Sequence, residues 1–84
     1  MPVSVTIEAA SKAEAELIAQ HLPVEARAQS WRGLGVIRLG RRSKQETADF
    51  IDAVSRSFRQ HELRWARVRY DDEERLFRTS RRGR

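Results

Sequence analysis

Arginine and tryptophan are the residues of this chain best suited to binding chemistry. Seventeen of the 84 residues are lysine or arginine, and both tryptophans, Trp31 and Trp65, have an arginine next to them in the sequence. A guanidinium group matches the geometry of a phosphate, and an indole ring offers a surface on which a nucleobase can stack. Together with the net charge of +5, these residue types favour a polyanionic partner.

The positive charge is unevenly distributed along the chain. Residues 1–74 hold twelve basic and twelve acidic side chains, so the whole excess lies in residues 75–84. Within the neutral part, residues 27–70 carry eleven basic side chains against four acidic ones. We therefore expect a basic surface formed by residues 27–70 and a separate basic C-terminal arm.

Groups that could catalyse a reaction or hold a metal are sparse. The chain has no cysteine, which excludes a thiol nucleophile, a thiolate zinc site and a disulfide framework. His21 and His61 fall near predicted helix C-termini, where the helix dipole stabilises an imidazolium, and neither has a sequence neighbour that suggests a triad or metal site. The acidic run at residues 71–74 is typical of a solvated patch. We therefore expect no catalysis, no cofactor, no metal and no small-molecule substrate.

The elements that position the arginines follow from apolar periodicity. Alternation of apolar and polar residues predicts strands, and a turn around Trp31–Gly33 suits a hairpin. Ser11 and Ser43 each begin a capping box, completed by Glu14 and Glu46, and open two amphipathic helices. The first helix has Ala15, Ile18 and Leu22 on one face and ends at Pro23, and the second has Thr47, Phe50, Ile51, Val54 and Phe58. The predicted strands are Val3–Glu8, Val24–Gln29, Leu34–Leu39 and Leu63–Tyr70.

This order of elements, βαββαβ, is typical of an α+β sandwich with the ferredoxin-like split βαβ fold. Right-handed crossovers then give a four-stranded antiparallel sheet in the order 4-1-3-2, with two helices on one face and the other face open. We expect residues 1–74 to form this single domain. Residues 75–84 form the basic tail, in which Leu76 and Phe77 are apolar enough to fold back over the open face and cover it.

Strand alternation indicates which side chains reach the open face. If the apolar positions of each strand point at the helices, the opposite positions hold four arginines against two glutamates, so the face is basic, with a few apolar groups among the arginines. The predicted set is Ser4, Thr6, Glu8, Glu25, Arg27, Gln29, Leu34, Val36, Arg38, Trp65, Arg67 and Arg69. In the last strand a twist or bulge would instead place Leu63 and Trp65 in the core.

The segment Arg32–Leu39, RGLGVIRL, resembles the third strand of an RNA recognition motif, which reads basic-Gly-aromatic-Gly/Ala-aromatic-aliphatic-any-aromatic. The basic residue, both small positions and the aliphatic residue match, and all three aromatic positions differ. The resemblance implies RNA binding on the open face, with Arg32 as a phosphate contact. Leu34 and Val36 occupy the positions at which that family stacks bases, and neither has a ring.

Two functions of different classes fit these features. The first is a small module that binds the phosphate backbone of single-stranded RNA or DNA, and its candidate residues are Arg27, Arg32, Arg38, Trp65, Arg67, Arg69, Arg81, Arg82 and Arg84. The second is a non-catalytic protein-interaction or self-association module that uses edge strands or the open face, with Leu34, Val36 and Trp65 as the interface. The shared positive charge of the open face and the tail favours the first.

The start of the chain, MPVSVTIEAA, lacks a basic segment followed by an apolar run, and no later segment reaches membrane-spanning length. The absence of cysteine fits a reducing compartment. We therefore expect a cytoplasmic protein with no membrane partner.

Overall fold

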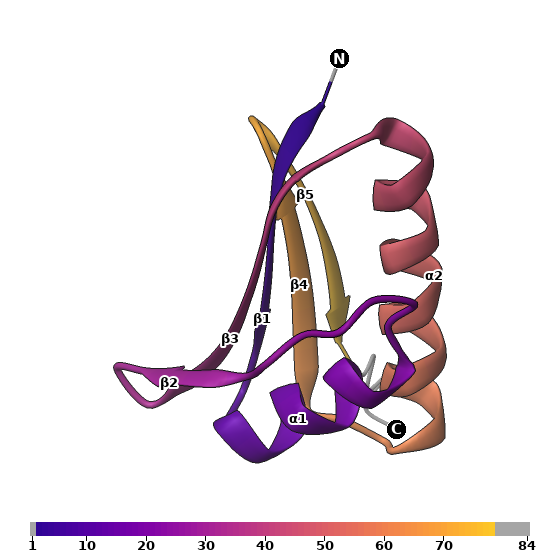
Figure 1. The fold of residues 1–84 in the computed structure, drawn as a ribbon. Helices are drawn as coiled ribbons and strands as arrows, with labels where there is room; N and C mark the ends of the chain where they lie inside the picture. The colour runs from indigo at the N-terminus through magenta and orange to yellow at the C-terminus, as the bar shows by residue number, and fades with distance from the viewer. Residues whose placement is uncertain (1, 79–84) are drawn as a thin grey trace.

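Five antiparallel strands and two helices make up the fold. The computed structural model describes residues 2–78 of the chain. The strands form one sheet in the order β2-β3-β1-β4-β5, and Figure 1 shows both helices on the same side of it. The elements are β1 (Val3–Ala9), α1 (Lys12–His21), β2 (Gln29–Trp31), β3 (Leu34–Arg42), α2 (Lys44–Gln60), β4 (Trp65–Tyr70) and β5 (Glu73–Arg78).

The α+β class with two helices and an antiparallel sheet agrees with the sequence, but the predicted four-stranded sheet is wrong. β1 lies between β3 and β4 as expected, and residues 73–78 add β5 alongside β4. Asp71, with a φ of 58°, begins the tight turn before β5, and its side chain accepts a hydrogen bond from the Ser4 N–H at 3.2 Å. Pairing with β5 satisfies backbone groups of β4 that would otherwise form an unpaired edge.

The second strand is shorter than the sequence predicts and shares only Gln29 with the predicted range. Alternation in Val24–Gln29 predicts a strand there, whereas pairing with β3 covers only Gln29–Trp31. The preceding loop still alternates, because Val24, Ala26 and Ala28 pack against the core while the residues between them are exposed. Alternation therefore indicates an extended segment with one apolar side. It does not show whether a neighbouring strand pairs with that segment.

Both helices begin at the predicted serine caps, but only the second forms the complete capping box. The Ser43 Oγ accepts from the Glu46 N–H at 3.1 Å, and the Glu46 carboxylate accepts from the Ser43 N–H at 3.0 Å. This hydrogen bond from the Ser43 backbone lowers the pKa of Glu46. In α1 the Ser11 Oγ accepts from the Glu14 N–H, whereas the Glu14 carboxylate binds Arg64 at 3.1 Å. The long-range ion pair replaces the second half of the box.

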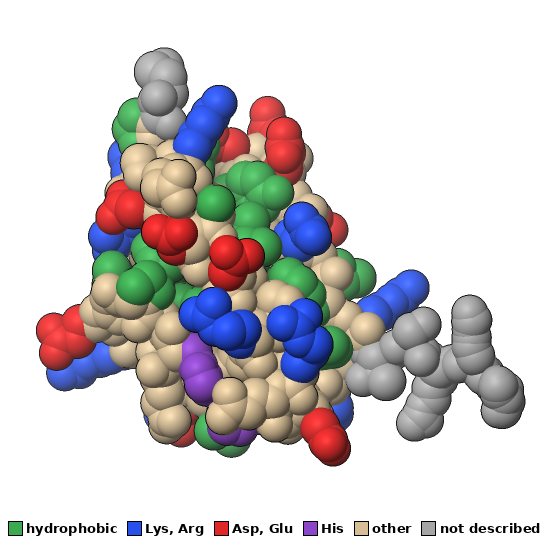
Figure 2. All heavy atoms as spheres, turned by 90° about the vertical axis from the view of Figure 1, so that its right-hand side faces the viewer, with side chains coloured by type: hydrophobic (Ala, Val, Ile, Leu, Met, Phe, Trp, Pro, Cys, Tyr) green, Lys and Arg blue, Asp and Glu red, His purple; other side chains and the backbone are tan. Residues whose placement is uncertain are grey.

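The outer surface of the helices is mixed in character. Figure 2 views the side that carries α2 and shows acidic, basic and apolar side chains interspersed over it. Neither helix within residues 2–78 is long and apolar enough to cross a membrane.

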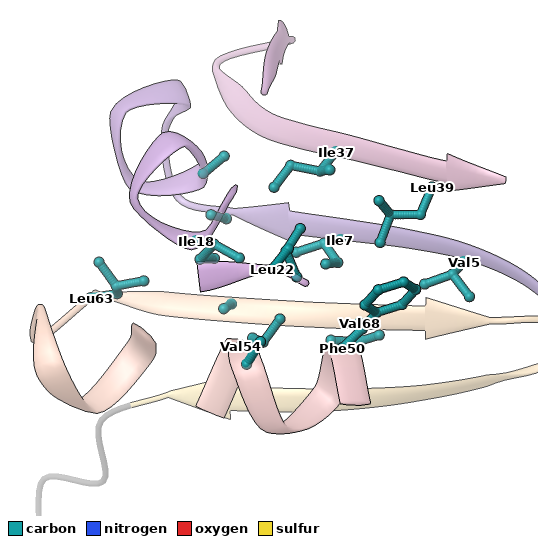
Figure 3. Packing of buried hydrophobic residues seen from close by; sticks show 14 residues of the cluster. Val5, Ile7, Ile18, Leu22, Ile37, Leu39, Phe50, Val54, Leu63 and Val68 are labelled. Atoms are coloured by element: carbon teal, nitrogen blue, oxygen red, sulfur yellow. The ribbon is translucent and has the colours of Figure 1, made fainter. Parts of the chain in front are cut away.

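A single hydrophobic core fills the space between the sheet and the helices. Figure 3 shows strand residues such as Ile7, Ile37 and Val68 clustered with Phe50 and Val54 of α2. All five side chains are fully buried, as the periodicity predicts. The same alternation sends the intervening strand residues to the opposite side of the sheet, which the helices leave uncovered.

Candidate functional site on the open face of the sheet

The open face, defined as the side of the sheet away from the helices, carries its residues in cross-strand rows. Directly opposed residues of antiparallel strands share a face, so the register assigns each row. At one end, Trp31 opposes Leu34, and Trp65 opposes Arg78. The following rows are Gln29, Val36, Glu8, Arg67 and Leu76, then Arg38, Thr6, Arg69 and Glu74, and finally Arg41 and Ser4. With five arginines and two glutamates, the face has a net positive charge.

A bulge in β3 brings Arg41 onto this face. The register shifts between Val5 and Thr6 of β1, so that Leu39 is an extra residue in β3. The next residue, Gly40, has a φ of 71°, a conformation that glycine adopts without a steric penalty. Strict alternation would place Arg41 on the helix side, and the bulge reverses this. Arg41 was not among the predicted site residues, although a glycine inside a strand pattern is a signal for such a bulge.

Glu8 binds two of the predicted site arginines at the centre of the open face. The Arg67 Nε donates to the Glu8 Oε1 at 2.8 Å, and the Arg69 Nη1 lies 3.7 Å from the Glu8 Oε2. The Glu8 side chain is only 10% exposed and that of Arg67 is 29% exposed, so solvent screens this ion pair weakly, whereas the Arg69 side chain is 56% exposed and its contact with Glu8 is screened more strongly. Glu8 therefore largely compensates the charge of Arg67. This pairing cannot be read from the sequence, because the two residues are 59 positions apart.

The arginines on the other side of β1 have no acidic partner within residues 2–78. Arg38 donates to the neutral Gln29 Oε1 at 3.1 Å, and no carboxylate in the described part of the chain forms a salt bridge with Arg38 or Arg41. Both side chains are exposed. A phosphate can bind them without first breaking an ion pair.

A shallow hollow of about 330 Å³ lies on the open face between these two groups of arginines. Glu8 and Val36 are buried at its base, whereas Trp31, which also lines it, is 47% exposed. The Arg32 guanidinium lies 4.9 Å from the centre of the Trp31 ring. The hollow therefore combines an accessible indole with guanidinium groups. Its lining residues are Ser4, Thr6, Glu8, Trp31, Val36, Arg38, Arg69 and Asp71.

Val36 and Trp65, which were predicted to form an apolar interface, are less accessible than that prediction requires. Val36 is only 3% exposed, because Gln29 and Glu8 flank it on the neighbouring strands, so it cannot be the centre of an interface. Trp65 lies on the open face but is partly buried, and the Arg67 guanidinium is 5.6 Å from the centre of its ring. Trp31, which was not among the predicted site residues, offers the more accessible indole.

Both glycines of the Arg32–Leu39 segment have a structural explanation in this fold. Arg32 and Gly33 form the turn between β2 and β3, with φ values of 52° and 83°, as a two-residue hairpin turn requires. A Cβ atom at Gly35 would collide with the Ser11 carbonyl oxygen at the start of α1. These two matches to the RNA recognition motif therefore follow from local turn and packing requirements.

The other basic residues predicted to bind nucleic acid lie around the edge of the open face. Arg27 is exposed in the loop before β2 and lines a separate hollow with Gln29 and Arg38. Arg32 is exposed in the hairpin turn. The tail residues Arg81, Arg82 and Arg84 lie outside the described residues.

Leu76 and Phe77 do not fold back over the open face. Both belong to β5, where Leu76 opposes Arg67 on the open face and is 47% exposed. Phe77 points to the helix side, where its ring centre is 6.1 Å from that of Phe58. β5 therefore widens the open face rather than covering it.

Comparisons with protein-family models, curated proteins and solved structures find no match to this chain. The described residues contain no group of three or more histidine, cysteine, aspartate or glutamate side chains arranged to hold a metal ion. The functional inference therefore depends on the geometry and charge of the open face.

Proposed function

We propose that the protein binds single-stranded nucleic acid, RNA or DNA, through the open face. Trp31 stacks on a base, and Arg38 and Arg41 contact the phosphate backbone. The observation that supports this proposal best is the hollow, in which an accessible indole and the guanidinium group of Arg38, which has no carboxylate partner among residues 2–78, lie on one concave surface. Aromatic stacking combined with a cationic groove is how many proteins bind single strands with little sequence preference.

The arrangement of strands and the distribution of charge support the same proposal. β1 to β4 have the neighbours of a ferredoxin-like split βαβ sheet, so we propose that the chain is such a domain with β5 as an addition. Residues 34–39 of the segment that resembles the RNA recognition motif lie on β3, between β2 and β1, and Arg32 and Gly33 lie in the turn before it. Arg81, Arg82 and Arg84 are proposed to add a basic arm that contacts phosphates further along the strand.

The proposal is tested by the affinity for a labelled single-stranded oligonucleotide, measured by fluorescence anisotropy at several salt concentrations. The logarithm of affinity should fall linearly with the logarithm of salt concentration, because binding releases counterions from phosphates. The double variant Arg38→Ala/Arg41→Ala removes two phosphate contacts. We expect the slope to become shallower by about 1.4, at about 0.7 for each contact with a single strand.

The matched control is the double variant Arg56→Ala/Arg59→Ala, which removes two exposed arginines from α2 on the other side of the molecule. Its net charge equals that of the open-face variant, so a general charge effect alters both equally. An equal loss of oligonucleotide affinity in both variants would contradict the proposal. So would the absence of binding by the unmodified protein at low salt.

A second candidate function is self-association or protein binding through the same face. The observation that favours it is the exposure of Trp31 and Leu76, each 47%, on the two outer strands of the open face. Apolar groups at this exposure form the centres of many protein interfaces. A molecular mass that rises with protein concentration, and that Leu76→Asp returns to the monomer value, would support this function. A monomer at every concentration would count against self-association.

A further inference from the structure

Two histidines that are 40 residues apart in the sequence meet at the surface on the helix side of the molecule. The Nε2 atoms of His21 and His61 lie 3.1 Å apart, and their ring planes are inclined by 63°. Figure 2 shows the two histidine side chains close to each other near the lower end of this side. No local sequence pattern indicates that they meet, because 40 residues separate them.

The contact is held by a well-packed helix pair. His21 is the last residue of α1 and His61 is the C-cap of α2, so the C-terminal ends of the two helices converge. One helical turn before each histidine, the Ser57 hydroxyl donates to the Leu17 carbonyl oxygen at 3.3 Å. Ser57 is fully buried, so this hydrogen bond holds the two helix ends in register. The imidazole pair is therefore positioned by the core rather than by a flexible loop.

The electrostatic surroundings of the pair favour a cation. The negative ends of two helix dipoles point towards this position, since both histidines lie at helix C-termini. A hollow beside His21 is lined by Asp49, Asp52 and Arg56, which together carry one net negative charge.

We propose that His21 and His61 bind one divalent transition-metal ion through their Nε2 atoms, with Zn²⁺ as the expected ion. Two imidazole nitrogens bound to one Zn²⁺ at about 2.0–2.1 Å are about 3.0–3.4 Å from each other, which includes the separation observed here. Imidazole is a preferred ligand of Zn²⁺, Ni²⁺ and Cu²⁺, whereas Mg²⁺ prefers oxygen. Two protein ligands leave further coordination positions for water or for a group from a partner.

Metal binding requires both Nε2 atoms to be unprotonated, and the hydrogen bonding of the pair permits this. Within residues 2–78, the only hydrogen bond of either ring is the one between the Nε2 atoms. Each ring can therefore move its proton to Nδ1 without losing another protein partner. The metal would link the ends of α1 and α2 and stabilise the folded chain, because the unfolded chain does not hold the two rings together.

The first test is thermal unfolding of the untagged, full-length chain with Zn²⁺ and, separately, with Mg²⁺. At a Zn²⁺ concentration ten times the dissociation constant, we expect the unfolding midpoint to rise by roughly 5–10 °C, with no rise in Mg²⁺. In parallel, Zn²⁺ should shift the NMR signals of both imidazole rings of the folded protein. An unchanged midpoint together with unchanged imidazole signals would overturn the proposal.

The variants His21→Gln and His61→Gln should each abolish the rise, since each removes one of the two nitrogen ligands. Glu62→Gln is the matched control, because it removes an exposed carboxylate next to His61 in the sequence without removing an imidazole, and it should keep the rise. If both histidine variants keep the rise, the ion binds elsewhere and the proposal is wrong. If either variant fails to fold, the imidazole signals of the unmodified protein decide. This site lies on the helix side, so its test is independent of nucleic-acid binding.

Discussion

Arginines lie on the open face on both sides of β1, but their charged neighbours differ. On the β4 side, Arg67 and Arg69 share the mostly buried carboxylate of Glu8. On the β3 side, Arg38 and Arg41 are exposed and have no carboxylate partner among residues 2–78. A count of arginines therefore overestimates the positive charge that a ligand can reach. We therefore predict that the open-face arginines on the β4 side mainly stabilise the fold, whereas those on the β3 side mainly bind the proposed nucleic-acid ligand.

The largest expected effect is on stability. Arg67→Ala leaves the Glu8 carboxylate with only the longer contact to Arg69, so we expect the free energy of unfolding to fall by about 2–3 kcal/mol. Arg38→Ala removes an exposed side chain whose partner is the neutral Gln29, and the change should stay within about 0.5 kcal/mol. Urea unfolding of both variants measures the two values. Equal losses of unfolding free energy in the two variants would contradict the distinction between the β4 and β3 sides of β1.

The next effect concerns the two tryptophans. Trp31→Ala should weaken oligonucleotide binding by about 1–3 kcal/mol, the contribution of one stacked base, with little change in stability. Trp65→Ala should affect stability more than binding, because its ring is partly buried against Arg67. Anisotropy at a fixed salt concentration, together with urea unfolding, compares them. If a folded Trp65→Ala protein loses more affinity than Trp31→Ala, the base stacks on the β4 side instead.

The smallest effect is a gain in binding. Glu8→Gln removes the carboxylate that pairs with Arg67 and Arg69, which makes a guanidinium on the β4 side available to a phosphate. We expect the salt dependence of affinity to steepen by about 0.7, equivalent to one more phosphate contact. Glu74→Gln is the control, because it changes the net charge of the open face equally without breaking an ion pair that involves Glu8. A similar change in both variants would indicate a general charge effect.

Much of the fold was predictable because its signals are local. The serine caps of both helices, the core positions of β1 and the apolar face of α2 all follow from patterns that repeat within a few residues. β5 was not predicted, because EERLFR is mostly charged and has little alternation. It becomes a strand because the turn at Asp71 brings it alongside β4, where its backbone groups find partners.

The candidate site was predictable as a basic face but not in its detail. Alternation assigned Arg38, Arg67 and Arg69 to the open face, where the register places them. Arg41 was missed because the bulge at Gly40 reverses the alternation. Trp31 was assigned to the turn, and its exposure depends on the short β2 pairing.

By itself, the sequence determined where helices begin, which side chains point to the core and the positive sign of the open face. These properties depend on backbone periodicity and on residues within one turn of each other. The pairing of Arg67 and Arg69 with Glu8, the burial of Val36 and the contact between His21 and His61 depend on the tertiary structure. Each of these depends on which distant segments become neighbours, because ion pairing, burial and ring contact act over a few ångströms in space regardless of separation along the chain.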